Sequence, residues 1–133
     1  MEVATSTEEA NKRAYVFPGQ GSQSVGMGTE LFESSRAARE TFEEADDSLG
    51  FPLSRLIFEG PAQGLQNTAN SQPAIMTMSV AAWRTWQEMQ GPEAMNAKAV
   101  AGHSLGEYTS LVAADVIDFS DAVKLVRRRG ELM

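Results

Sequence analysis

The feature that most constrains the fold is the pentapeptide Gly102-His103-Ser104-Leu105-Gly106, which separates two segments of different periodicity. The apolar run over 98–103 predicts a short buried strand. A helix over 105–114 is predicted by the spacing of Leu105, Tyr108, Leu111 and Val112. A strand that enters a helix through Gly-x-Ser-x-Gly is typical of a nucleophile elbow, a sharp turn that holds a serine hydroxyl clear of the sheet. An ordinary Gly-Ser turn at a helix start is the alternative interpretation.

The two glycines support the first interpretation. Gly102 and Gly106 stand two residues before and two residues after the serine, where so tight a turn leaves no room for a side chain. The N–H group of Leu105 would then face a developing oxyanion at the positive end of the helix dipole. Ser104 is therefore the candidate nucleophile.

Composition limits the class of protein. The chain has 133 residues, of which 42% are hydrophobic, so it can bury a core. Its net charge of −7 argues against nucleic acid as the main partner, and the absence of cysteine removes thiol nucleophiles and cysteine metal sites and fits a cytoplasmic setting. The longest apolar stretch, 74–83, is too short to cross a bilayer, so we expect no membrane partner.

The rest of the pattern predicts a polar, mobile tail over 1–13 and a buried strand over 14–17 that Pro18 ends. The glycine-rich loop that follows lacks the third glycine of a dinucleotide fingerprint and the lysine of a P-loop. Its two glycines flank Gln20 and let the backbone of that residue approach a ligand closely. Further helices are expected at 35–49, 53–58, 73–90 and 120–133, with a loop containing one helical turn at 60–70.

Arg129 is a second candidate site residue because it falls on the apolar face of the last predicted helix. That face combines Ala122, Leu125, Val126, Arg129, Leu132 and Met133. A guanidinium is costly to bury alone, and it binds a carboxylate through two parallel hydrogen bonds. From the residues alone, an internal salt bridge or a side chain that extends to water explains Arg129 equally well.

The chain offers no clear general base for a serine nucleophile. Its single histidine is His103. Successive strand residues project to opposite faces, so we expect His103 to point away from the Ser104 hydroxyl and to be a packing residue. The base is then expected outside these 133 residues. Two recognisable strands are also fewer than the four to six or so of a typical sheet, which predicts the N-terminal part of a larger α/β enzyme.

Four motifs, in this order and spacing, resemble the malonyl-CoA:acyl carrier protein transacylases of fatty-acid synthesis, which also occur as domains of polyketide synthases. They are Val16–Gln23, Gln72–Ala74, Gly102–Glu107 and Arg129–Gly130. The resemblance implies a hydrolase-like parallel-sheet subdomain interrupted by a ferredoxin-like insertion. Residues 14–133 would be the incomplete large subdomain, roughly the first half of a family member, with the insertion and the remainder absent.

The same resemblance implies site roles and substrates. Ser104 would be the acylated nucleophile, the N–H groups of Gln20 and Leu105 the oxyanion hole, and Arg129 the group that binds the malonyl carboxylate. Malonyl-CoA and the phosphopantetheinylated acyl carrier protein would react in a ping-pong sequence, with no cofactor or metal bound. The catalytic histidine would lie in the absent half, so the chain alone is expected to be inactive.

Two other functions stay open at this point. A serine esterase or thioesterase would use the same elbow. A non-catalytic truncated fragment would bind a partner through its uncovered core. We also hypothesise that a basic surface made by Lys124, Arg127 and Arg128 receives the acidic carrier protein.

Overall fold

The computed structural model describes residues 13–133. The predicted mobile tail, apart from Arg13, lies outside the described residues. Along the described chain the elements are β1 (Ala14–Phe17), α2 (Thr29–Ser34), α3 (Arg36–Leu49), α4 (Leu53–Glu59), α5 (Ala62–Gln66), α6 (Thr68–Gln90), the 3₁₀ helix η1 (Gly91–Met95), β2 (Ala99–Gly102), α7 (Leu105–Ala113) and α8 (Phe119–Leu132).

The two described strands form a parallel pair, which confirms the α/β class. Ala14 lies opposite Ala99 and Phe17 lies opposite Gly102. Parallel strands need a crossover connection, and here it includes every element from α2 to η1. The carboxyl ends of both strands therefore meet at one edge, where ligands bind in open α/β sheets.

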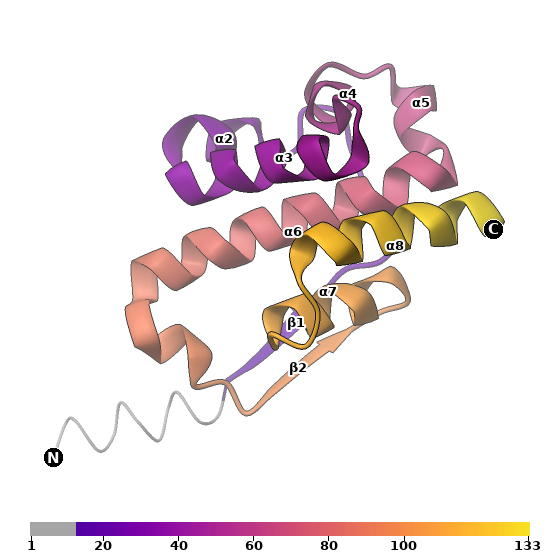
Figure 1. Cartoon of the computed structure of the whole chain (residues 1–133). Helices are drawn as coiled ribbons and strands as arrows, with labels where there is room; N and C mark the ends of the chain where they lie inside the picture. The colour runs from indigo at the N-terminus through magenta and orange to yellow at the C-terminus, as the bar shows by residue number, and fades with distance from the viewer. Residues whose placement is uncertain (1–12) are drawn as a thin grey trace, which may run out of the picture.

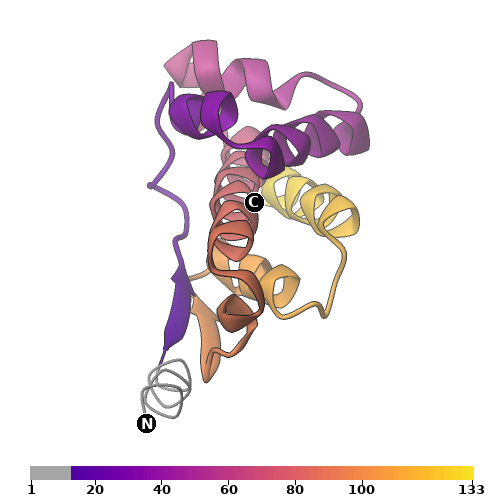
Figure 2. The ribbon, with the colours of Figure 1, turned by 90° about the vertical axis from the view of Figure 1, so that its left-hand side faces the viewer.

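The elements are stacked in tiers around α6 (Figures 1 and 2). Helices α2 to α5 lie on one side of α6 and α8, whereas α7 and the sheet lie on the other side. This arrangement gives α6 neighbours on several sides, which agrees with its nearly continuous run of buried residues over 71–81.

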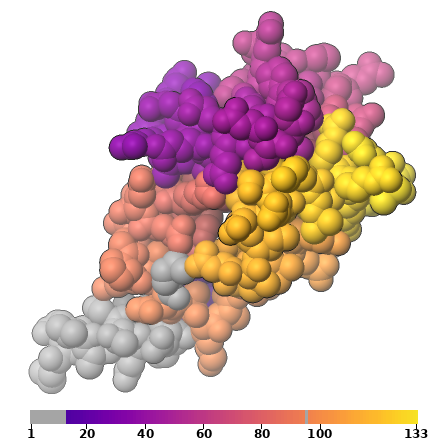
Figure 3. Space-filling view, viewed as in Figure 1, coloured from indigo at the N-terminus to yellow at the C-terminus, as the bar shows by residue number. Residues whose placement is uncertain are grey.

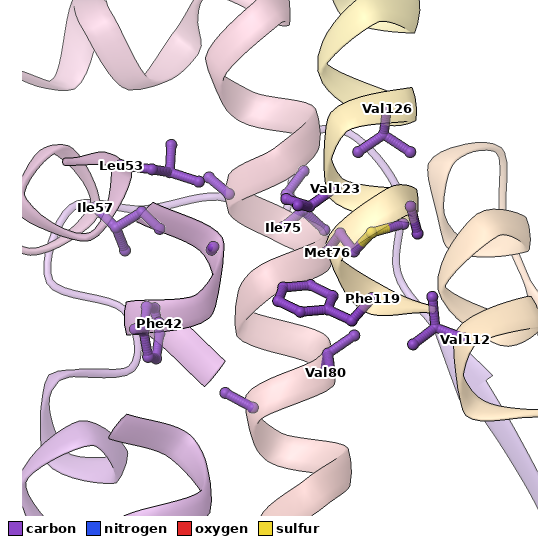
Figure 4. Close-up of a cluster of buried hydrophobic side chains, with 14 of the residues drawn as sticks. Phe42, Leu53, Ile57, Ile75, Met76, Val80, Val112, Phe119, Val123 and Val126 are labelled. Carbon is purple, nitrogen blue, oxygen red and sulfur yellow. The ribbon is translucent and has the colours of Figure 1, made fainter. Parts of the chain in front are cut away.

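The main core fills both sides of α6 (Figure 4). Phe42 of α3 and Leu53 of α4 pack on one side, and Val123 and Val126 of α8 pack on the other; all four are fully buried. Full burial of such a side chain contributes about 1.5–3 kcal/mol.

A smaller cluster attaches the sheet to α6. Phe17 of β1 and Ala113 of α7 pack with Trp83 of α6. The ring of Tyr15 meets Trp83 edge-on at 4.6 Å between centroids, and Trp86 Nε1 donates a hydrogen bond of 3.1 Å to the Tyr15 hydroxyl. The aromatic contacts fix the orientation of β1 against the long helix.

The start of α6 differs from the prediction. The helix begins at Thr68 rather than at Pro73, with the Asn67 side chain accepting a hydrogen bond of 3.0 Å from the N–H of Ala69. Pro73 lies inside the helix and has no N–H for the Ala69 carbonyl. Arg127 of α8 donates to that carbonyl at 3.2 Å instead. The helix therefore continues through a proline because a neighbouring helix supplies the missing donor.

The buried face of α8 is also rotated from the predicted one. The helix begins at Phe119, with Asp118 rather than Ser120 at the N-cap position. Val123 and Gly130 are buried, whereas Leu125 is 46% exposed and Leu132 is 71% exposed. Figure 3 shows α8 forming a strip of the surface next to α3.

Gly130 explains this rotation. A Cβ on residue 130 would lie 2.5 Å from the carbonyl oxygen of Thr68, so α8 approaches the first turn of α6 with backbone against backbone. A face lined by leucines would hold the two helices farther apart. A smaller departure occurs in α7, where Leu111 is 43% exposed although its spacing predicts burial, and Thr109 is fully buried instead.

Candidate active site

Ser104 occupies a strained turn between β2 and α7. Its backbone has φ 52° and ψ −109°, and it is one of two non-glycine residues with positive φ among those described. Backbone in such a region costs about 1–3 kcal/mol and persists only where the surroundings impose it. The residue is exposed, and its side chain does not cap α7. The hydroxyl is thus left accessible at the N-terminus of a helix.

The two glycines of the pentapeptide impose this turn. A Cβ on Gly102 would lie 2.0 Å from the carbonyl carbon and oxygen of Gly106. A Cβ on Gly106 would lie 2.2 Å from the carbonyl oxygen of Phe17, at the end of β1. These atoms belong to backbone and cannot move aside separately, so the prediction that both positions exclude a side chain is confirmed.

Arg129 reaches Ser104 from α8. Its Nη2 donates to the Ser104 Oγ at 3.2 Å, and its Nη1 donates to Oε1 of Gln72 at 2.8 Å. The guanidinium carbon lies 5.3 Å from the centre of the Tyr108 ring, close enough for a cation–π contact. The side chain is partly buried. None of the three contacts neutralises the cation, which is therefore available to an anion beside the hydroxyl.

The loop after β1 lies against the turn that carries Ser104. A Cβ on Gly19 would lie 2.5 Å from the His103 carbonyl oxygen, so the segment that leads into Gln20 is adjacent to the serine turn. Gln23 holds this loop, because its Oε1 accepts from the N–H of Gly21 at 2.8 Å and its Nε2 donates to Gln66 at 2.7 Å.

The N–H groups of Gln20 and Leu105 make no hydrogen bond in the described part of the chain. The Leu105 N–H belongs to the first turn of α7, where helix geometry leaves donors without a partner inside the helix. Both N–H groups belong to segments next to Ser104 and can donate to an incoming oxygen atom.

His103 is exposed and not part of the core, and its carbonyl oxygen and ring lie against Gly19. Within residues 13–133 the imidazole makes no hydrogen bond to Ser104, whose Oγ interacts with Arg129.

Sequence reasoning gave no role to two residues of this site, Gln72 and Tyr108. Gln72 is fully buried, although it follows the polar residues Asn70 and Ser71 near the start of α6. A buried polar side chain needs a partner, but nothing in this polar stretch marks Gln72 as buried. The spacing of Tyr108 predicts an apolar face, and the residue does pack against the main core; its ring also faces the Arg129 guanidinium, a contact that the spacing does not reveal.

The predicted basic surface on α8 is largely paired within the chain. Lys124 lies 3.5 Å from an Asp121 oxygen, and Arg128 lies 3.2 Å from a Glu131 oxygen. Hydrogen bonds from Arg128 and Arg127 hold the pKa of the Glu131 carboxyl below its usual value. Arg127, expected off the buried face, is only 29% exposed at its side chain and stacks on the Phe51 ring.

Comparison with known proteins identifies the family. A model of the acyl transferase domain matches residues 14–133. The chain belongs to this acyl transferase family. It is 52% identical over 122 residues to the malonyl CoA-acyl carrier protein transacylase of Salmonella typhimurium, a match that covers 90% of this chain and 38% of that protein. The corresponding transacylase of Bacillus subtilis is 50% identical over 123 residues, covering 92% of this chain and 38% of the relative.

Solved structures give the same result. An acyl carrier protein S-malonyltransferase from Vibrio cholerae superposes with a TM-score of 0.84 at 49% identity. The match covers 90% of this acyl transferase chain and 38% of the Vibrio cholerae chain. A malonyl-transacylase solved in complex with its type II polyketide synthase acyl carrier protein has a TM-score of 0.85 at 48% identity. That match covers 92% of this chain and 38% of the solved chain. The chain thus spans 38% of the length of these relatives.

Two features are absent from the described residues. No helix between residues 13 and 133 combines the length and the apolar character that a membrane crossing requires. No group of three or more histidine, aspartate or glutamate side chains in that range is arranged to hold a metal ion.

Proposed function

We propose that this chain takes part in transferring a malonyl group from malonyl-CoA to the phosphopantetheine thiol of acyl carrier protein, through an acyl-enzyme on Ser104, in fatty-acid biosynthesis in the cytoplasm. The observation that carries the proposal is the distance of 3.2 Å between Arg129 Nη2 and Ser104 Oγ. In a malonyl thioester one methylene separates the reacting carbonyl from the free carboxylate. A cation this close to the nucleophile suits an acyl group that carries a negative charge near its reactive carbon.

The proposed chemistry has two symmetrical halves. The Ser104 oxygen attacks the thioester carbonyl and gives up its proton, the carbon–sulfur bond breaks, and CoA leaves as its thiol. The carrier thiol then attacks the serine ester, its proton is taken up in exchange, and Ser104 recovers its hydroxyl. Arg129 holds the malonyl carboxylate in both halves and also favours the developing charge on Oγ.

We assign the oxyanion hole to the N–H groups of Gln20 and Leu105, and we interpret the turn as a nucleophile elbow. The strained φ of Ser104, the excluded side chains at positions 102 and 106, and the two free N–H groups support this assignment. Preorganised donors of this kind need no rearrangement when the negative charge forms.

The proton acceptor for Ser104 is proposed to come from outside these 133 residues, so the chain alone is expected to be inactive. The single histidine and its lack of a hydrogen bond to Ser104 in the described residues support this. Residues 14–133 would then be part of the large subdomain of the enzyme, which agrees with the extent of the family match.

Chemical rescue tests the proposal on the chain itself. Incubation with malonyl-CoA and a high concentration of imidazole, which substitutes for the missing base, is expected to add a malonyl group to the peptide that contains Ser104, as seen by mass spectrometry. Without imidazole the adduct is expected to be scarce, and free pantetheine should accept the group from the adduct.

Three controls make the experiment decisive. An adduct that persists in Ser104→Ala refutes the acyl-enzyme. Equal labelling by malonyl-CoA and acetyl-CoA refutes the role of Arg129, as does an unchanged malonyl preference in Arg129→Ala. Rapid release of free malonate with no transfer to pantetheine favours a thioesterase.

A further inference from the structure

The loop that carries the Gln20 N–H has little rigidity of its own. Glycine stands on both sides of Gln20, and Gly21 has φ 104°. Glycine has the widest choice of backbone torsions, so the chain at Gly19 and Gly21 does not by itself fix the direction of the Gln20 N–H. An oxyanion hole needs donors that already point at the oxygen when its negative charge forms. The rigidity of this loop must therefore come from hydrogen bonds.

Ser22 holds the peptide that contains the Gln20 N–H. Its Oγ donates to the Gly19 carbonyl oxygen at 2.8 Å, and its own N–H donates to the same oxygen at 3.4 Å. The Gly19 carbonyl and the Gln20 N–H belong to one trans peptide, in which the C=O and the N–H point in opposite directions. Because Ser22 holds the oxygen at one side of the peptide plane, the Gln20 N–H is directed to the other side.

Gln23 holds the next peptide and connects the loop to α5. The side chain is buried, its Oε1 accepts from the Gly21 N–H at 2.8 Å, and its Nε2 donates to Gln66 at 2.7 Å. Since a backbone N–H only donates, the amide oxygen must face Gly21 and the amide nitrogen must face α5. The peptides before and after the Gln20 Cα are thus each held by a side chain from the same loop.

We propose that Ser22 and Gln23 are positioning residues that preorganise the oxyanion hole by fixing the two peptides on either side of Gln20. The inference rests on the proposed function and deepens it. Both side chains act through the backbone, because their hydrogen bonds go to Gly19, Gly21 and Gln66. Donors aimed at a developing oxyanion stabilise the transition state more than the bound substrate. Ser22 and Gln23 should therefore affect the rate of acylation and not the affinity for malonyl-CoA.

Acylation rates separate positioning from binding. The imidazole-dependent addition of a malonyl group to Ser104 is followed by mass spectrometry over a range of malonyl-CoA concentrations, for the full chain and its variants. Ser22→Ala removes one neutral hydrogen bond and should lower the maximal rate about three- to tenfold. Gln23→Met keeps the length of the side chain and removes two hydrogen bonds, so the maximal rate should fall about tenfold or more, up to the roughly hundredfold cost of losing one oxyanion donor. The malonyl-CoA concentration that gives half the maximal rate should stay unchanged in both variants.

Thr29 provides a matched control away from the serine turn. Its Oγ1 donates at 2.8 Å to the Gly26 carbonyl, three residues earlier, which is the same contact that Ser22 makes with Gly19. Thr29→Val removes this contact with little change in shape, and its maximal rate should equal that of the wild-type chain. Equal losses of rate in Thr29→Val and Ser22→Ala would indicate a general loosening of the chain and would overturn the inference. A weaker affinity at an unchanged maximal rate in Ser22→Ala would overturn it as well.

The wild-type chain and Ser104→Ala distinguish the two proposals. If the wild-type chain gains no malonyl group with imidazole, or if Ser104→Ala gains it equally, the proposed function fails and this inference fails with it. If the wild-type chain is acylated on Ser104 while Ser22→Ala and Gln23→Met react at the wild-type maximal rate, the proposed function stands and the inference fails.

The direction of the Gln20 N–H can also be measured without substrate. In a weakly aligned, isotope-labelled sample, the residual dipolar coupling of the Gln20 amide depends on the angle of its N–H bond. Ser22→Ala and Gln23→Met should change this coupling, whereas Thr29→Val should leave it at the wild-type value. An unchanged coupling in both loop variants would contradict the orienting contacts, whatever the acylation rates.

Discussion

Replacing Arg127 with methionine is expected to destabilise the chain by about 2–3 kcal/mol. Its largest contribution is the hydrogen bond of 3.2 Å to the Ala69 carbonyl, which Pro73 leaves without a partner in α6. This carbonyl is partly buried, so the loss of its partner costs about 1–2 kcal/mol, and the hydrogen bond from Arg127 to Asn70 Oδ1 is lost as well. Stacking on the Phe51 ring at 4.9 Å adds about 0.5–1 kcal/mol. The ion pair with Glu131, whose side chain is 40% exposed, contributes little.

A double-mutant cycle isolates the carbonyl from the other contacts. Pro73→Ala restores an N–H four residues after Ala69, so the helix can satisfy its own carbonyl. In that background Arg127→Met should cost about 1 kcal/mol less than in the wild-type chain. The free energies of unfolding of all four proteins are obtained from urea denaturation, with equal m values as the check on a common unfolding reaction. If the costs of the two single variants add up to the cost of the double variant within about 0.5 kcal/mol, Arg127 does not replace the missing N–H of Pro73.

Three further predictions concern single sites. Gly130→Ala should destabilise the chain by about 1–3 kcal/mol, because its Cβ would lie 2.5 Å from a backbone oxygen of α6. Gly64→Ala is the control: its Cβ would meet a flexible side chain at 3.2 Å, so it should be neutral or stabilising by up to about 1 kcal/mol. Asp46→Ala should cost about 1–2 kcal/mol, since its carboxylate accepts a backbone N–H at 2.8 Å in the first turn of α4. Glu131 has a lowered pKa in the fold, so its stabilising contribution is present at neutral pH and is lost as the pH falls through that pKa. An NMR titration should show the Glu131 pKa rising in Arg128→Ala.

Each of these has a contrary outcome. Equal urea midpoints for Gly130→Ala and Gly64→Ala would mean that the helices separate at no cost. An unchanged midpoint in Asp46→Ala would make its hydrogen bonds to α4 unimportant. A Glu131 pKa that does not respond to Arg128→Ala would assign the shift to another cause.

The strands and the serine turn were predictable because their signals are local. Alternation and apolar runs place both strands to within a residue of β1 and β2. The capping serine at position 35 and the terminating glycine at position 50 give the bounds of α3, which the structure confirms. The Gly-x-Ser-x-Gly pattern is contiguous, so the sequence alone predicted the turn at Ser104. The contact with Phe17 of β1 that excludes a side chain at Gly106 is supplied by the fold.

The errors arose where a distant element overrides a local preference. Pro73 predicts a helix start, and α6 runs through it because Arg127, in another helix, bonds the Ala69 carbonyl. Likewise, the helical wheel ranks Leu125 as buried, whereas the close contact of Gly130 with α6 rotates α8. Gln72 went without a role because its partner Arg129 is remote in sequence, and only the fold brings the two together.

The serine turn is made of backbone atoms that leave no free volume at positions 102 and 106, while the groups around Arg129 are side chains from separate helices. Under the proposed function, reactivity and choice of acyl group are therefore encoded in different parts of the polypeptide. Substitutions of the side chains around Arg129 would then alter the acyl group that is accepted and leave the bend at Ser104 intact.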